Sequence, residues 1–351
     1  PPRSTLFPYT TLFRSHEVRR YTLRDLDLAF CTGCWTCWWK TPGRCVFKDD
    51  IVDIHQEMVR ADLIVWASPL ILGNVSSLLK TAQDRFVPMV HPYISIQGGE
   101  CHHRPRYARE PDIGLIVGPG PDDGELDLAL ARAFFERFAK NAHGRFRLFA
   151  TPDTPLAQAV KAALYGPELP AGTELPSWIA DSAPRLAAAA GGADIGPRRL
   201  FVNGSPRGKV SNSALLLSWI AQGMTAAGIA DAASIPVVDL APQDRLAAQL
   251  EAFRAADEVI IALPLYTDSV PAIVKRFLEA LSASGPAGIR GKRVAFIIQS
   301  GFPELVHSET VAVYLARAAA RLGFMHAGTL VRGGIEGIRI QIGRASCRER
   351  V

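Results

Sequence analysis

The second half of the chain alternates short apolar runs with segments whose apolar residues have helical spacing. The apolar runs predict five strands: RLFVN, SIPVVDL, DEVIIAL, KRVAFII and FMHAGTL. The intervening segments predict helices over residues 214–227, 246–255, 270–281 and 309–322. Buried strands that alternate with amphipathic helices are typical of a parallel sheet covered on both faces. This half is therefore predicted to be a complete α/β unit.

The first half carries the same order of elements without its beginning. HEVRRYTL corresponds to the second strand, DLIVWAS to the third, DIGLIVGP to the fourth and GRFRLFA to the fifth. Residues 61–86 align with residues 256–281 and share seven identities, at Ala61, Asp62, Ala67, Pro69, Leu70, Val75 and Lys80. These identities favour a tandem duplication in which the first copy lacks its first strand, loop and helix.

Neither end of the chain is similar to a natural protein terminus. LFPYTTLFRS, within residues 1–15, back-translates into DNA that resembles a common sequencing adaptor. Residues 342–351 correspond to the reverse complement of that DNA in another frame. We therefore interpret residues 1–15 and 341–351 as adaptor-derived and exclude them from fold prediction.

Excluding these ends changes the charge of the protein. The whole chain has a formal net charge of +5, and the excluded ends hold five arginines and one glutamate, which leaves +1. A nearly neutral protein gives no basis for a nucleic-acid or membrane-surface partner. No apolar run is long enough to cross a bilayer and no signal peptide is visible, so a cytoplasmic location is expected.

The loop NGSPRGKVSNS, residues 203–213, follows the first strand of the second half and precedes its first helix. In a doubly wound sheet this junction lies at the carboxyl edge, where ligands bind. Backbone N–H groups and a helix N-terminus suit a phosphate dianion, as do the side chains of Ser205, Arg207, Ser211, Asn212 and Ser213. The pattern is neither GxGxxG nor a Walker loop. The simpler interpretation is a turn with Ser211 as N-cap, and we favour the phosphate loop.

NGSPR followed by SNS, with PLY after the third strand, resembles the NADPH-dependent FMN reductase branch of the flavodoxin-like superfamily. The resemblance implies an α/β fold of two tandem flavodoxin-like, doubly wound parallel five-stranded sheets of order 2-1-3-4-5. The first sheet would lack its initial strand and its domain the first helix. The domains would span residues 16–150 and 199–340, with an extension and linker over residues 151–198.

The same resemblance assigns residues to the cofactor. Ser205, Arg207, Ser211, Asn212 and Ser213 would hold the FMN phosphate, and Pro264, Leu265, Tyr266 and Thr267 would line the isoalloxazine. Gly301, in SGFPE after the fourth strand, belongs to the same crevice. In the first half Ile71 stands at the position of Tyr266, and GPGPDDGE, residues 118–125, is either a flavin-edge loop or a plain turn. Without its own phosphate loop, the first half is not expected to bind FMN tightly.

Four cysteines follow the spacing C-x2-C-x2-C-x7-C, at Cys31, Cys34, Cys37 and Cys45. Soft thiolates with no histidine in the run favour an iron-sulfur cluster or zinc. The motif resembles that of iron-sulfur flavoproteins, which implies a 4Fe-4S cluster in addition to FMN. Zinc, or reduced thiols packed among neighbouring tryptophans, are the alternatives. Cys101, His102 and His103 follow a Gly-Gly pair, and a solvated polar loop is favoured there over a second metal site.

These features predict an FMN-dependent NAD(P)H oxidoreductase that passes electrons to a quinone, an aromatic compound, a flavin or an iron-sulfur acceptor. A non-enzymatic electron carrier is one alternative. A flavin-free binding or assembly protein with a structural zinc or thiol loop is another. The expected partner is a small-molecule electron acceptor or a redox protein, and the chain is expected to form a homodimer or an internal pseudo-dimer.

Overall fold

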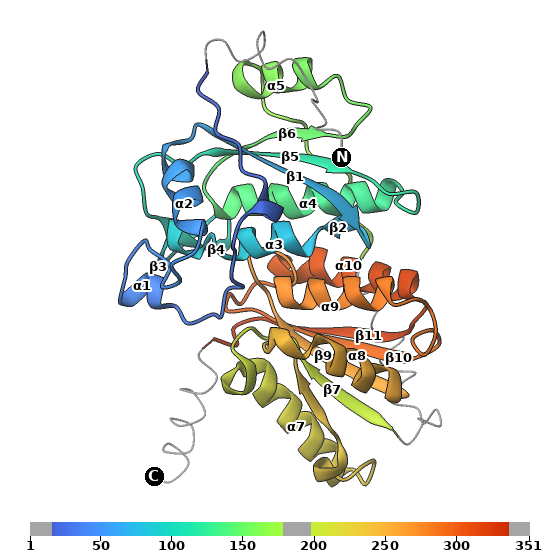
Figure 1. Ribbon diagram of the computed structural model, residues 1–351. Coiled ribbons are helices and arrows are strands. Elements are labelled where there is room, and N and C mark those ends of the chain that lie inside the picture. Colours follow the sequence, from blue (N-terminus) through green and yellow to red (C-terminus); the bar gives the residue numbers. More distant parts are fainter. Residues whose placement is uncertain (1–15, 178–197, 337–351) are drawn as a thin grey trace.

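The second half forms the predicted parallel sheet. The computed structural model describes residues 16–177 and 198–336, and the ends interpreted as adaptor-derived lie outside these ranges (Figure 1). The strand order is β11-β10-β9-β7-β8, which is the predicted 2-1-3-4-5 order, and all neighbouring strands are parallel. The strands are β7 (Arg199–Asn203), β8 (Val237–Asp239), β9 (Glu258–Pro264), β10 (Arg293–Gln299) and β11 (Met325–Arg332).

The helices of this half lie where the apolar spacing predicts them. They are α7 (Asn212–Ala226), α8 (Leu246–Ala255), α9 (Ala272–Ala283) and α10 (Val306–Leu322), with 3-10 turns at Gly208–Val210, Ala232–Ser234 and Gln243–Arg245. Ser211 is the N-cap of α7, and its Oγ accepts a hydrogen bond from Ala214 N at 3.1 Å. Helix α10 ends at Gly323, whose φ of 72° provides a left-handed C-cap.

The first half has a smaller sheet of order β2-β1-β5-β6. Its strands are β1 (Leu63–Ile71), β2 (Asn74–Val75), β5 (Asp112–Gly118) and β6 (Phe146–Ala150). Strands β1, β5 and β6 are parallel, whereas the short β2 is antiparallel to β1. Its helices are α1 (Thr36–Trp39), α2 (Ile51–Arg60), α3 (Ser77–Asp84) and α4 (Glu125–Asn141), with α5 (Leu156–Tyr165) in the predicted extension and 3-10 turns at Leu23–Asp25 and Val87–Met89.

One predicted strand of the first half is wrong. HEVRRYTL has no strand, so the sheet lacks its second strand as well as its first. In the order 2-1-3-4-5 the second strand pairs only with the first. Because the described part of this half holds no first strand, HEVRRYTL has no neighbour with which to form a ladder.

The first half also contains an insertion that the repeat does not share. Strands β3 (Val90–Gln97) and β4 (Glu100–Pro105) form an antiparallel hairpin that turns at Gly98 and Gly99, both with positive φ. In the second half, the chain runs from α9 to β10 through turns alone. The predicted solvated polar loop at residues 101–103 is therefore wrong, since these residues pair in the hairpin and His102 is fully buried.

The two halves meet through helices. Helix α3 packs against α9, and α4 packs against α10, so these four helices separate the two sheets (Figure 1). One hydrophobic cluster includes buried residues of both halves. In the residues that the structure describes, each helix is too short or too polar to cross a membrane.

Equivalent lysines bind equivalent carbonyl groups across this interface. The alignment of residues 61–86 with 256–281 pairs Lys80 with Lys275, and Ile71 with Tyr266. Lys80 Nζ donates a hydrogen bond to Tyr266 O at 2.7 Å, and Lys275 Nζ donates to Ile71 O at 2.6 Å. The two halves therefore exchange the same contact.

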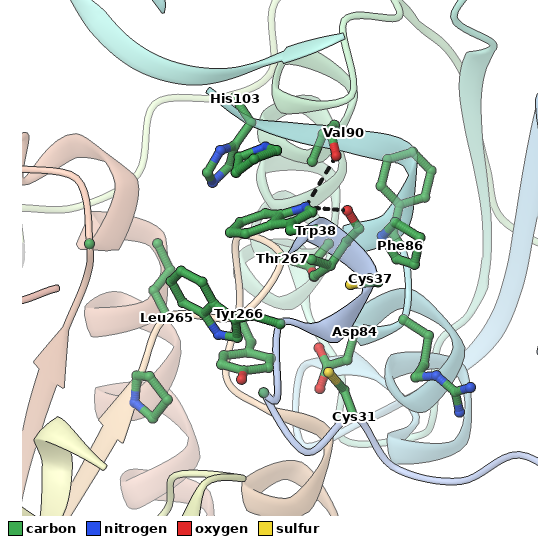
Figure 2. Close-up of a pocket in the computed structure, with 18 of the residues that line it drawn as sticks. Cys31, Cys37, Trp38, Asp84, Phe86, Val90, His103, Leu265, Tyr266 and Thr267 are labelled. Carbon is green, nitrogen blue, oxygen red and sulfur yellow. Dashed lines mark hydrogen bonds between the residues drawn. The ribbon is translucent and has the colours of Figure 1, made fainter. Parts of the chain in front are cut away.

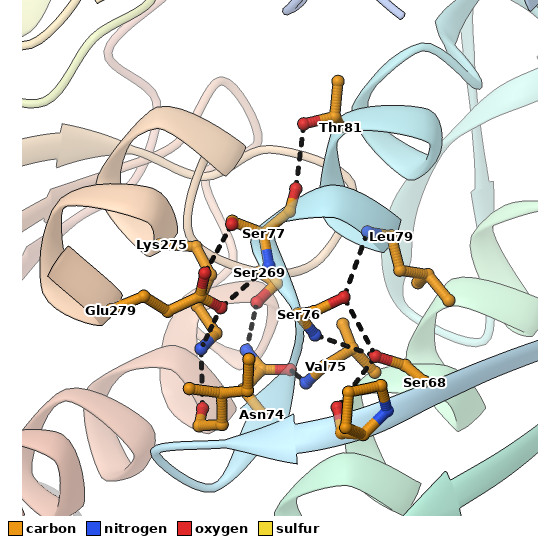
Figure 3. A network of polar contacts seen from close by, with 12 residues as sticks. Ser68, Asn74, Val75, Ser76, Ser77, Leu79, Thr81, Ser269, Lys275 and Glu279 are labelled. Atoms are coloured by element: carbon orange, nitrogen blue, oxygen red, sulfur yellow. Dashed lines mark hydrogen bonds and ion pairs between the residues drawn. The ribbon is translucent and has the colours of Figure 1, made fainter. Parts of the chain in front are cut away.

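The acidic partners of these lysines repeat the exchange. Asp84 Oδ2 accepts from Ala272 N at 2.7 Å. The equivalent Glu279 Oε1 accepts from Ser77 N at 2.8 Å (Figure 3). Each acid also pairs with the lysine four residues before it. Each carboxylate thus caps the first turn of the helix from the other half.

One contact joins two residues that are equivalent to each other. Asn74 Nδ2 donates to Ser269 Oγ at 3.0 Å, and the alignment pairs these positions (Figure 3). A residue that contacts its own equivalent lies on a two-fold axis. The interface therefore has the pseudo-two-fold symmetry of an isologous dimer within one chain.

Candidate functional site

A cavity of about 620 Å³ lies between the two halves (Figure 2). The loops after β7, β9 and β10 line it from the carboxyl edge of the second sheet. Nine residues predicted to bind FMN line this cavity: Ser205, Arg207, Ser211, Asn212, Pro264, Leu265, Tyr266, Thr267 and Gly301. The tenth, Ser213, is fully buried in the first turn of α7 and does not line it.

Asn203 organises the loop between β7 and α7, a role that sequence analysis did not assign. Its Nδ2 donates to Gly208 O at 2.9 Å and to Asp239 Oδ1 at 2.6 Å. Its Oδ1 accepts from Ser205 N at 3.2 Å and from Ser211 Oγ at 3.3 Å. One buried amide therefore holds both ends of the loop and ties it to β8. The asparagine of NGSPR was the signal for this role.

Several features of the loop fit a phosphate group. Ser205, Ser211 and Asn212 line the cavity and bring two hydroxyls and an amide to it, whereas Ser213 does not line it. The first turn of a helix leaves backbone N–H groups without intrahelical acceptors. Arg207 lines the cavity with its side chain exposed and adds a positive charge. Hydroxyl groups, a helix N-terminus and a cation at one cavity together suit a phosphate dianion.

The turn after β9 has an unusual backbone. Thr267 and Asp268 have φ values of 45° and 59°, in the left-handed region that β-branched residues rarely adopt. Tyr266 N donates to Ser269 O at 2.9 Å, and Ser269 N donates to Tyr266 O at 3.1 Å. These two bonds hold the strained turn against the cavity. Strain of this kind is concentrated at functional sites.

The four cysteines lie in one segment that lines the same cavity. Burial raises the pKa of Cys31 to about 12 and that of Cys37 to about 11. Burial also opposes ionisation of Cys34, but hydrogen bonds from Thr36 and Thr32 lower its pKa overall. Over residues 16–177 and 198–336, no group of three or more His, Cys, Asp or Glu side chains is arranged to hold a metal ion. The thiols share one cavity but do not have a coordinating geometry.

Gly33 allows the cysteine segment to approach the loops of the second half. Its φ is 61°, and a Cβ atom there would clash with Tyr266 Oη and lie 2.8 Å from Arg207 Cγ. Glycine alone fits such a close approach at this backbone angle. The cysteine segment of the first half therefore contacts two residues that are predicted to bind FMN in the second half.

Sequence analysis missed the wall that the β3–β4 hairpin contributes. Trp38 Nε1 donates to Val87 O at 3.0 Å and to Val90 O at 3.1 Å, which ties the cysteine segment to the hairpin (Figure 2). The ring of His103 lies 4.7 Å from that of Trp38. Two short runs around Gly98-Gly99 were the available hairpin signal.

The equivalent edge of the first half holds an ion network. Arg317 Nη2 lies 2.9 Å from Asp127 Oδ2, and Arg321 Nη1 lies 2.5 Å from Asp123 Oδ1. A Cβ atom on Gly73, in the turn after β1, would clash with Asp127. Asp123 and Asp127 therefore bind α10 of the second half.

A doubly wound sheet with a hydroxyl-rich, cationic loop at its carboxyl edge is typical of proteins that bind a flavin or nucleotide phosphate. The family model of NADPH-dependent FMN reductases matches residues 9–125 and 197–328, and the chain belongs to this family. The two matched regions correspond to the two halves. FMN binding is thus supported at the level of the family.

Individual relatives match shorter parts. An iron-sulfur flavoprotein of Archaeoglobus fulgidus is 35% identical over 75 residues, which are 21% of this chain and 33% of that protein. An iron-sulfur flavoprotein of Methanocaldococcus jannaschii is 38% identical over 73 residues, 21% of this chain and 37% of that protein. The chain spans about a third of the length of these curated relatives. The solved general stress protein 14 of Treponema denticola in complex with FMN is 17% identical, with a TM-score of 0.32 over 43% of this chain and 95% of that one.

Proposed function

We propose that the chain is an oxidoreductase that binds FMN in its second half and uses NADH or NADPH as electron donor. The observation that carries this proposal is the cavity, which gathers nine residues predicted to bind FMN from three loops of one sheet edge. These loops are contiguous in space but separated by up to about a hundred residues in sequence. The family to which the chain belongs supports the same cofactor.

Different residues would bind different parts of the cofactor. Ser205, Ser211 and Asn212 would bind the phosphate with the N-terminus of α7, and Arg207 would neutralise its charge. Tyr266 would flank the isoalloxazine, and burial raises the pKa of its hydroxyl, which therefore stays protonated. Bound FMN would supply two-electron chemistry between a nicotinamide and an acceptor.

Arg207→Ala is expected to raise the dissociation constant of FMN about 10- to 100-fold, because a charge-assisted hydrogen bond contributes about 1.5–3 kcal/mol. Quenching of FMN fluorescence measures the constant, and NADPH oxidation by the loaded chain tests the activity. Arg245→Ala, at an exposed position of the second half, is the control. Equal affinity in the two variants would remove Arg207 from the phosphate site. A loaded wild-type chain that does not oxidise NADH or NADPH would instead be an electron carrier.

We further propose that Cys31, Cys34, Cys37 and Cys45 hold a 4Fe-4S cluster beside the flavin, with zinc as the alternative. Thiolates are soft ligands, which suit iron-sulfur clusters, and all four cysteines line one cavity. The close approach of Gly33 to Tyr266 places their segment beside the proposed flavin site. The raised pKa values of two thiols mean that metal binding must displace their protons. Two relatives are named iron-sulfur flavoproteins.

Cys37→Ser is expected to reduce the iron and acid-labile sulfide of anaerobically purified protein to below about a tenth of the wild-type content, since each ligand of a cluster is needed for its assembly. Cys101→Ser is the matched control, because Cys101 lies in the hairpin strand β4 and not in the cysteine segment. Iron and sulfide are measured by colorimetric assay and zinc by mass spectrometry. Zinc in place of iron in the wild type would support the alternative, and neither metal would refute both.

A further inference from the structure

A row of rings from both halves forms one wall of the cavity. His103 lies 4.7 Å from Trp38 and 5.1 Å from Phe302, measured between ring centroids. Phe302 lies 5.0 Å from His307. All four residues line the cavity. The wall therefore offers both ring surface for stacking and imidazole nitrogens for hydrogen bonding.

The position of this wall relates it to the predicted flavin site. Phe302 follows Gly301, which is predicted to lie in the flavin-binding crevice, and His307 lies in the first turn of α10. His103 comes from β4 of the inserted hairpin, which the second half lacks. The wall thus combines the loop after β10 of the second half with a hairpin found only in the first half.

His307 carries a buried hydrogen-bond donor without an acceptor. Its side chain is 1% exposed, and Arg137 Nη2 lies 2.9 Å from Nδ1. A guanidinium group can only donate, so Nδ1 accepts and the neutral ring has its proton on Nε2. Burial and the nearby Arg137 lower the pKa of His307 to about 4, which keeps the ring neutral at pH 7.

The Nε2 atom of His307 has no hydrogen-bond partner in the described part of the chain. The oxygen Glu304 Oε2 lies 3.5 Å away, which is beyond a normal hydrogen bond. A buried donor without an acceptor costs about 1–3 kcal/mol. An oxygen atom of a ligand would remove this cost. The carboxylate of Glu304 beside Nε2 opposes an anionic ligand and favours a neutral carbonyl oxygen, whereas the charge of Glu100 is already paired with Arg137 and Lys140.

We propose that this wall binds a planar ring that carries a carbonyl group, with the ring stacked on the aromatic row and the carbonyl oxygen bound by His307 Nε2–H. This inference rests on the proposed function and adds the residues that bind and orient the ring of one of its substrates. Two sources share this chemistry. One is the nicotinamide ring of the electron donor with its carboxamide, and the other is a quinone acceptor.

The test uses His307→Leu, which removes the donor at similar volume, and His307→Gln, which keeps an N–H group. Arg137 retains its bond to Glu100 at 2.9 Å in both variants. Three rates are measured anaerobically by rapid mixing: flavin reduction by NADPH, reoxidation by 1,4-naphthoquinone, and reoxidation by ferricyanide, which has neither ring nor carbonyl. His91→Leu is the matched control, because His91 lies in the hairpin but does not line the cavity.

His307→Leu is expected to slow one of the first two rates about tenfold at low substrate concentration, while flavin content and the ferricyanide rate stay within about twofold. His307→Gln is expected to recover much of that loss. Slower reduction by NADPH identifies the nicotinamide as the ligand, and slower reoxidation by the quinone identifies the acceptor. Unchanged rates, or equal loss of all three, would overturn the inference. A wild-type chain without flavin would instead refute the proposed function, and this inference with it.

Discussion

Glu279→Ala is expected to lower the free energy of unfolding by about 3–5 kcal/mol, which is the usual cost of removing one partner from a buried ion pair. Glu279 Oε1 lies 2.9 Å from Lys275 Nζ, and Lys275 is fully buried. The carboxylate also binds the backbone and hydroxyl of Ser77 in the other half. The variant would leave a buried ammonium group without its counter-charge and Ser77 N in the first turn of α3 without its acceptor, although Ser76 still caps the helix.

Urea unfolding followed by circular dichroism measures this loss. Glu251→Ala is the control, because the pair of Glu251 with Arg254 is on the surface and contributes below about 1 kcal/mol. The double variant Lys275→Met, Glu279→Leu is expected to lower the free energy of unfolding less than Glu279→Ala alone does, since no unpaired charge remains. If Glu279→Ala lowered the free energy of unfolding no more than Glu251→Ala does, the contacts of Glu279 across the interface would not stabilise the packing of the two halves.

Asp268→Asn is expected to stabilise the protein by about 3 kcal/mol at pH 8 and to leave stability unchanged below about pH 4. Burial raises the pKa of Asp268 from 3.8 to about 6. The folded protein therefore binds the proton more tightly than the unfolded chain does. The stability that this proton provides is complete below pH 3.8 and is lost as the pH rises through 6, at about 1.4 kcal/mol per pKa unit.

Asparagine at position 268 reproduces the neutral acid at every pH. It can still accept the hydrogen bond from Asn141 Nδ2, and asparagine tolerates the positive φ of this position. Urea midpoints of both proteins at pH 4, 6 and 8 measure the difference. Asp244→Asn, at an exposed position, controls for the change from carboxyl to amide. A constant difference across this pH range would show that Asp268 does not titrate between 4 and 6.

The local features of the second half could be predicted from its sequence. The spacing of apolar residues that distinguishes strands from helices can be seen within a single short segment. Strand β9 and helix α8 therefore lie where this spacing predicts them. The loop that we propose to bind phosphate could also be located, because Ser205 and Ser211 lie at the junction of a strand and a helix. In the first half, HEVRRYTL had the composition of a strand, but strand formation needs a neighbouring strand, and residues 16–177 contain none beside it.

The duplication itself was visible in identities such as Lys80 and Lys275, yet their role was not. Both lysines are buried because the two copies face each other, and a lysine in an amphipathic helix gives no sign of the surface that will cover it. The contacts of Gly33 and His103 could not be predicted for the same reason. Their neighbours Tyr266 and Phe302 lie more than 190 residues away along the chain.

The sequence alone was sufficient for the fold class, the duplication and the candidate ligands of FMN, because these depend on spacing within single elements and loops. Packing of the two copies brought the cysteine segment, the hairpin and the loops after β9 and β10 around one cavity. That arrangement depends on long-range contacts whose energy is shared among many side chains. No local sequence pattern predicts this arrangement, and it is this arrangement that makes the site between two similar halves asymmetric.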